Sequence, residues 1–184
     1  MNLPNKLTMV RVCMIPFFVV FAKMGAAWAQ FVAVGIYVVA CLTDMLDGRI
    51  ARSRNLVTNF GKFMDPIADK LLVMSALIVL TAQGRMPDWV CILILAREFM
   101  VSGFRLVAVE NGVVIAAGPL GKLKTVFQMV STIALMLLVP VDAAPLLGRA
   151  GEVFACVLMY VALALTVVSG ADYIIRNKDC ISDM

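Results

Sequence analysis

Six apolar stretches, each close to 20 residues long, constrain the fold of this chain more than any other feature of its sequence. They lie at about 7–27, 31–52, 60–81, 88–110, 122–141 and 149–173. A helix needs about 20 apolar residues to cross a bilayer. Lipid offers the backbone no hydrogen bonds, so each stretch is expected to be a helix. We therefore predict one all-α integral membrane domain over residues 1–184, with six transmembrane helices.

Composition agrees with a membrane protein. Hydrophobic residues make up 62% of the chain and charged residues 15%, which is too apolar for a soluble domain of this size. The five cysteines are scattered without metal-binding spacing, and this pattern indicates packing residues rather than disulfides or a zinc site. Helix breakers separate the stretches: Gly25, Gly84 with Pro87, Gly118-Pro119 with Gly121, and Pro140 with Pro145 and Gly148.

The distribution of basic residues predicts that both termini are cytoplasmic. With that orientation, 13 of the 16 basic residues fall on the inside, and the outside has only Lys23, Arg85 and Arg149. The inside set is Lys6, Arg11, Arg49, Arg52, Arg54, Lys62, Lys70, Arg97, Arg105, Lys122, Lys124, Arg176 and Lys178. Cytoplasmic loops carry such an excess of lysine and arginine. The net charge of +4 then reflects topology and attraction to anionic lipid and phosphate, and it does not suggest nucleic acid.

The N-terminus also allows a second interpretation. Lys6 and Arg11, the apolar residues 12–22 and the small residues around Trp28 resemble a secretory signal peptide. Its removal would leave five spans.

Four aspartates lie at helical spacing on the second and third stretches. Asp44 and Asp47 are three residues apart, and Asp65 and Asp69 are four apart, so each pair occupies one helix face. Carboxylates near hydrocarbon are costly and need a partner, for which a multivalent metal is suited. The chain has no histidine, so a general base must come from another residue type. Separate solvation of each aspartate at the water boundary is the alternative.

A short turn around residues 55–59 would place the two aspartate pairs opposite each other. Two divalent cations would neutralise the four charges, and Mg²⁺ prefers carboxylate oxygen. Gly48, Ala51 and Gly61 have little or no side chain, so a phosphate or nucleotide could approach the helix backbone. Arg52 could pair with phosphate oxygens. This pattern predicts phosphoryl transfer at two metal ions.

The pattern D-x2-D-G-x2-A-R-x8-G-x3-D-x3-D, from Asp44 to Asp69, resembles the signature of the CDP-alcohol phosphotransferase family without a gap or mismatch. The resemblance implies the family's fold of six transmembrane helices. It also implies a homodimer, and an active site facing the cytoplasm from the bacterial inner membrane. In the reaction it implies, an alcohol attacks the β-phosphorus of a CDP-linked lipid and CMP leaves.

The resemblance also implies roles for individual residues. Asp44, Asp47 and Asp65 match metal ligands, and Asp69 matches a residue that approaches a metal and acts as the base. The expected cofactor is two Mg²⁺ ions per site, with Mn²⁺ as the alternative. Positions near the CDP group are matched by Gly48, Ala51, Arg52, Gly61, Asn5 and Thr8. For Asn5 and Thr8, capping of the first helix is the alternative role.

Basic residues in the second half are candidates for binding a phosphorylated acceptor. Arg97 and Arg105 are about 12 Å apart along a helix and roughly 80° around it, so both can border one cavity. Lys122 and Lys124 point roughly 200° apart, and Lys124, with Gln128 one turn away on the same side, is favoured to face that cavity. Snorkelling of Lys122 to the interface and a purely structural Arg97–Glu98 pair are the alternatives.

Three segments resemble the branch of the family that uses glycerol 3-phosphate as acceptor: residues 2–11, 97–105 and 121–125. The substrates implied are CDP-diacylglycerol, within membrane lipid, and glycerol 3-phosphate. Inositol phosphate, serine or phosphatidylglycerol as acceptor remains an alternative. A cation transporter is a more distant one, because the acids gather toward one membrane face and no inverted repeat is present.

Overall fold

Six α-helices form the computed structural model, which describes residues 3–54, 59–110, 118–139 and 147–177. The side chains of residues 3–8, 44–54, 59–66, 69 and 109–110 lie outside the described part. No strand occurs in the four described ranges. The helices are α1 (Leu3–Lys23), α2 (Ala27–Arg54), α3 (Asn59–Ala82), α4 (Asp88–Glu110), α5 (Pro119–Leu138) and α6 (Gly148–Arg176).

The helices coincide with the six apolar stretches, so the prediction of an all-α fold is confirmed. Their ends differ by a few residues, as α2 begins at residue 27 and α6 continues to residue 176. Polar residues can extend a helix beyond its apolar run, because the backbone hydrogen bonds are internal to the helix. Of the described helices, α5 and α6 are long and apolar enough to cross a membrane. A crossing by all six helices stays a prediction.

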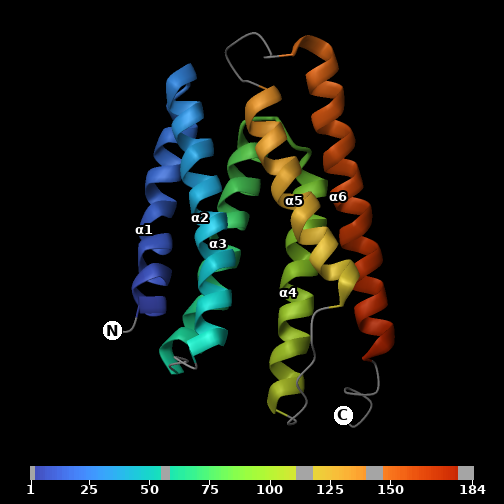
Figure 1. Ribbon diagram of the computed structural model, residues 1–184. Helices are drawn as coiled ribbons and strands as arrows, with labels where there is room; N and C mark the ends of the chain where they lie inside the picture. The colour runs from blue at the N-terminus through green and yellow to red at the C-terminus, as the bar shows by residue number, and fades with distance from the viewer. Residues whose placement is uncertain (1–2, 55–58, 111–117, 140–146, 178–184) are drawn as a thin grey trace.

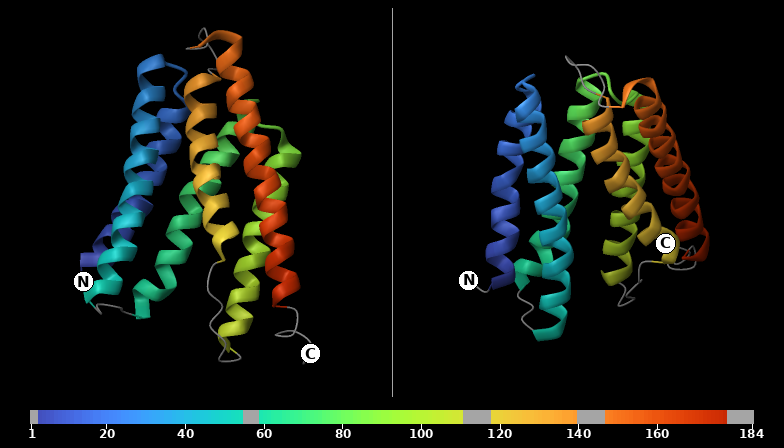
Figure 2. Two further views of the ribbon diagram at one scale, coloured as in Figure 1. Left: turned by 45° about the vertical axis from the view of Figure 1, so that its right-hand side comes forward. Right: turned by 45° about the horizontal axis from the view of Figure 1, so that its top comes forward.

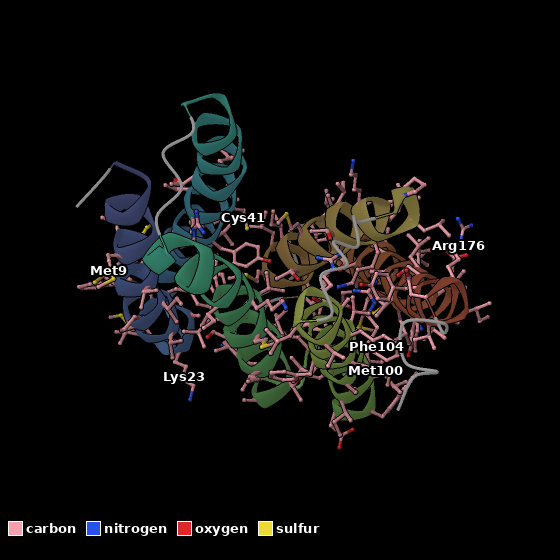
Figure 3. The ribbon with its side chains drawn as sticks, turned by 90° about the horizontal axis from the view of Figure 1, so that it is seen from below. Met9, Lys23, Cys41, Met100, Phe104 and Arg176 are labelled. Carbon is pink, nitrogen blue, oxygen red and sulfur yellow. The ribbon has the colours of Figure 1, made fainter. Side chains whose placement is uncertain are left out.

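The helices run alternately up and down, so α1 begins and α6 ends at the same end of the bundle, which we call the lower end (Figure 1). Helices α1, α2 and α3 form one half of the bundle, and α4, α5 and α6 form the other (Figures 1 and 2). Seen from below, Met9 on α1 and Arg176 on α6 lie on opposite sides (Figure 3). The two halves meet mainly where α3 contacts α4 and α5 and where α2 contacts α5.

Apolar side chains from all six helices form one core. In the first half, the rings of Phe18 and Tyr37 lie 5.9 Å apart and are fully buried. Four of the cysteines fall in the described part, and none of these four forms a disulfide. The two buried ones, Cys41 and Cys91, belong to the core, which agrees with the predicted packing role.

Glycine and proline determine where several helices start and stop. Gly25 and Gly84 adopt positive φ angles of 68° and 69° in the turns after α1 and α3. This left-handed conformation carries little cost for glycine. Gly118 is extended and Pro119 begins α5, a position where the missing N–H of proline leaves no bond unmade.

At the upper end, Arg85 ties three segments together. Its Nη1 donates to the Met136 carbonyl at 3.3 Å and its Nη2 donates to Gln30 Oε1 at 3.2 Å. Gln30 Nε2 donates to the same Met136 carbonyl at 2.9 Å. The Met136 carbonyl lies in the last turn of α5. Carbonyl groups in the last turn of a helix have no N–H donor within the helix and lie at the negative end of its dipole. Arg85 was counted above as an outside loop charge, but it is 8% exposed and points into the bundle.

We predict that Arg85→Met destabilises the protein by about 1–3 kcal/mol, because the Met136 carbonyl and Gln30 Oε1 each lose a hydrogen bond from Arg85. Thermal unfolding of the purified protein in detergent measures this. The control is Arg149→Met, which removes an exposed arginine near the start of α6 and should change stability by less than about 0.5 kcal/mol. Equal effects of the two substitutions would contradict the structural role of Arg85.

Candidate active site

The aspartate pattern lies on the lower parts of α2 and α3, which are antiparallel neighbours (Figure 1). Both segments are helical, so Asp44 and Asp47 share one face of α2, and Asp65 and Asp69 share one face of α3. This agrees with the predicted placement of the backbone. The side chains lie outside the described residues, as do those of Gly48, Ala51, Arg52, Gly61, Asn5 and Thr8.

A network of charged side chains joins α4, α5 and α6 inside the lower half of the bundle. Glu98 Oε1 accepts hydrogen bonds from Arg97 Nη1 at 3.0 Å and from Lys124 Nζ. Arg97 Nη2 also donates to Ser169 Oγ on α6 at 3.0 Å. The exposed fractions of the three charged side chains are 15% for Arg97, 19% for Glu98 and 3% for Lys124. One carboxylate thus holds two cations that come from different helices.

Close packing keeps Arg97 in this position. A Cβ atom added at Gly170 of α6 would lie 3.0 Å from Cγ of Arg97, which is tighter than ordinary van der Waals contact. Glycine therefore lets α6 approach the arginine stem, and the neighbouring Ser169 receives the guanidinium.

A cavity opens beside this network, where α3 meets α4 and α5. Its polar walls are formed by Lys70, Glu98, Lys124, Thr125 and Gln128, and its apolar walls by Val73, Met74, Leu77, Leu95 and Met129. Mostly apolar walls with a few converging polar groups are typical of small-molecule sites. The cavity lies at the junction of the two halves of the bundle, where helices from both can contribute ligands.

The orientation predicted for the two lysines of α5 agrees with the structure. Lys124 lines the cavity and is buried, whereas Lys122 is exposed. Gln128 lies one turn above Lys124 and also lines the cavity. The role of Lys124 in binding phosphate stays a prediction.

The two arginines of α4 do not border this cavity, contrary to expectation. Neither is among the residues that line it. Arg97 reaches Ser169, and the guanidinium carbon of Arg105 lies 5.7 Å from the ring centre of Tyr173. Ser169 and Tyr173 are one turn apart on α6, so both arginines face α6 rather than α3. The spacing of Arg97 and Arg105 predicts their relative positions on α4, but it does not predict which neighbouring helix they face.

Lys70 is a cavity residue that the sequence interpretation assigned no role. It follows Asp69 on α3, and its Nζ donates to Ser102 Oγ on α4. Ser102 in turn donates to the carbonyl of Glu98 at 2.5 Å. Lys70 therefore connects the aspartate helix to the charged network. In the sequence, the feature that indicates a role for Lys70 is its position next to Asp69 within an apolar stretch.

Divalent metal ions fit the aspartate helices by the chemistry of the donor set. Four aspartates on two adjacent helices would offer carboxylate oxygens, the hard ligands that Mg²⁺ and Mn²⁺ take. No group of three metal-binding side chains occurs among the residues whose side chains are described, which exclude Asp44, Asp47, Asp65 and Asp69.

Comparison with known proteins identifies the family. Residues 1–168 match the model of the CDP-alcohol phosphatidyltransferase family. The chain is 40% identical to the CDP-diacylglycerol–glycerol-3-phosphate 3-phosphatidyltransferase of Bacillus subtilis, over 98% of this chain and 97% of the relative. It is 44% identical to a probable phosphatidylglycerophosphate synthase of Mycobacterium tuberculosis, over 95% of this chain and 81% of the relative. The chain therefore belongs to the CDP-alcohol phosphatidyltransferase family, whose members generally depend on a divalent metal.

We predict that Glu98→Gln lowers the free energy of unfolding by about 3 kcal/mol, because it leaves the buried Lys124 and the half-buried Arg97 without their carboxylate. Adding Lys124→Met to Glu98→Gln should restore part of this loss. Unfolding of the single and double variants in detergent measures the coupling. As a control, Asp172→Asn breaks the more exposed Asp172–Arg176 pair and should cost less than about 1 kcal/mol. Additive effects at Glu98 and Lys124 would contradict the network.

Proposed function

We propose that this protein transfers the phosphatidyl group of CDP-diacylglycerol to sn-glycerol 3-phosphate, giving phosphatidylglycerol phosphate and CMP. The proposal rests on the similarity of this chain to relatives that are named for this activity. The chain is about 40% identical to them over nearly its whole length. The aspartate pattern on α2 and α3 supports the phosphoryl-transfer half of the reaction. The buried cations on α4 and α5 support an anionic acceptor.

In the proposed mechanism, Asp69 takes the proton from the primary hydroxyl of glycerol 3-phosphate as that oxygen attacks the β-phosphorus. An aspartate base fits a chain without histidine. Two Mg²⁺ ions, held by Asp44, Asp47, Asp65 and Asp69, would supply charge that stabilises the phosphoryl oxygens. The small residues Gly48, Ala51 and Gly61 leave room for the nucleotide, with Arg52, Asn5 and Thr8 near it.

The acceptor phosphate is bound where Lys124 lines the cavity and Arg97 shares the carboxylate of Glu98 with it. Arg105, which lies over Tyr173, and the exposed Lys122 add positive charge beside this site. Guanidinium and ammonium groups form strong charge-assisted hydrogen bonds to phosphate. Glu98 already orients Arg97 and Lys124, so less side-chain entropy is lost on binding.

We further propose that all six helices cross the bacterial inner membrane and that the lower end faces the cytoplasm. The excess of basic residues assigned to that side supports this orientation. At the upper end, exposed Trp28 and Trp89 stand near the starts of α2 and α4, as tryptophans do at a membrane interface. A homodimer, as the family resemblance implies, stays a prediction.

The direct test of the proposed function is incubation of the purified protein with CDP-diacylglycerol, Mg²⁺ and one acceptor at a time. Mass spectrometry of the lipid product should identify phosphatidylglycerol phosphate with glycerol 3-phosphate as acceptor. Inositol phosphate, serine and phosphatidylglycerol should give less than about a hundredth of that rate. A main product from one of these three would replace the proposed acceptor, and ion flux without any lipid product would favour a transporter.

Asp69→Asn should lower the rate of CMP release by at least about a thousandfold, because the base and one metal ligand are both lost. The matched control is Asp88→Asn, at the exposed start of α4, which should retain the wild-type rate. Appreciable turnover by Asp69→Asn protein with unchanged membrane insertion would remove Asp69 from the role of base.

Arg105→Ala should raise KM for glycerol 3-phosphate about tenfold, since it removes one positive charge proposed to attract the acceptor phosphate. KM for CDP-diacylglycerol should stay within about twofold. Steady-state kinetics with each substrate varied in turn separates the two values, and Arg149→Ala is the control. An effect confined to CDP-diacylglycerol would assign Arg105 to the other substrate.

A further inference from the structure

Gln128 is the buried polar residue of the cavity that the proposed mechanism does not use. It lies on α5, is 3% exposed, and forms part of the cavity wall. Its backbone carbonyl accepts hydrogen bonds from Ser131 Oγ at 3.0 Å and Thr132 Oγ1 at 2.8 Å. Its side-chain oxygen has no hydrogen-bond partner among the residues that the structure describes.

The two other glutamines of the chain are half-buried, and the side-chain amide of each forms hydrogen bonds. Gln30 bonds the Met136 carbonyl and receives a hydrogen bond from Arg85, and Gln83 Nε2 donates to the Ala22 carbonyl at 2.6 Å. Burying an amide without a partner costs free energy. Both of these amides hold helices together through hydrogen bonds, whereas the Gln128 side-chain oxygen has no partner in the described part of the chain and belongs to a residue that lines the cavity.

The position of Gln128 suits a small polyol phosphate. Residues four apart on a helix are separated by about 6 Å along its axis, so the amide lies roughly that far above the ammonium-bearing residue Lys124. A phosphate near Lys124 would leave the carbon chain of the ligand extending toward Gln128, between the apolar side chains of Leu77 and Leu95. An amide can accept a hydrogen bond from a hydroxyl and donate one to it.

We propose that Gln128 determines acceptor specificity by hydrogen-bonding the hydroxyl of the acceptor that does not react. This inference rests on the proposed function, in which glycerol 3-phosphate brings one reacting primary hydroxyl and one secondary hydroxyl. The primary hydroxyl is assigned to Asp69, and the secondary hydroxyl pairs with the Gln128 amide. A phosphorylated alcohol without that second hydroxyl would leave the amide buried and unpaired, and the site would discriminate against it.

The test compares two acceptors in wild-type and Gln128→Met protein. The acceptors are glycerol 3-phosphate and 3-hydroxypropyl phosphate, which has the same chain length, phosphate and primary hydroxyl but no secondary hydroxyl. Wild-type protein should prefer glycerol 3-phosphate in kcat/KM by at least about tenfold. Gln128→Met has similar volume and no amide, so the preference should fall about tenfold, with little change for 3-hydroxypropyl phosphate.

Gln30→Met is the matched control, because it removes a half-buried, hydrogen-bonded amide at the upper end of the bundle. It should lower thermal stability and leave the preference between the two acceptors unchanged. The preference is a ratio measured on one protein sample, so partial loss of folded enzyme cancels from it. If Gln128→Met is too unstable to purify, Gln128→Leu replaces it in the same comparison.

Two outcomes contradict different claims. If wild-type protein uses glycerol 3-phosphate and Gln128→Met keeps the wild-type preference, or loses activity equally with both acceptors, Gln128 has a structural role and the inference is wrong. If wild-type protein makes no lipid from glycerol 3-phosphate but uses another acceptor, the proposed function fails, and the inference about the secondary hydroxyl fails with it.

Discussion

The bridge from Glu98 to Arg97 and Lys124 is the interaction on which the lower half of this bundle depends. A lone charge inside apolar surroundings is costly, and a pair is tolerated only when its geometry and remaining hydrogen bonds are good. Glu98 binds two cations, and Ser169 accepts a further hydrogen bond from the Arg97 guanidinium. The bridge fixes α4 against α5, and the Arg97–Ser169 bond fixes α4 against α6.

A cavity lies between the two halves of the bundle, which have limited mutual contact. The first half carries the acidic helices, and the second carries the charged network (Figure 1). Between them, the cavity takes Lys70 from α3, Glu98 from α4, and Lys124 and Gln128 from α5. The helices that carry the aspartates and the helices that carry the cations are thus neighbours at one end of the bundle, which the proposed transfer between two substrates requires.

Length, apolarity and helical spacing predicted much of this arrangement, because they depend on local sequence. The six helices, the shared faces of the aspartates and the inward direction of Lys124 follow from such periodicity. Contacts between helices do not follow from periodicity within one helix. The burial of Arg85, the bond from Lys70 to Ser102 and the turn of Arg97 toward α6 depend on which helices become neighbours. No spacing within one helix carries that information.

The account's central claim is that the acceptor phosphate binds at the charged network beside the cavity. An experimental structure of the protein with glycerol 3-phosphate bound measures this directly. The account predicts the phosphate within hydrogen-bond distance of Lys124 Nζ, with the carbon chain directed toward Gln128. A phosphate bound elsewhere, with Glu98 still holding Lys124 and the cavity empty of acceptor, would contradict it.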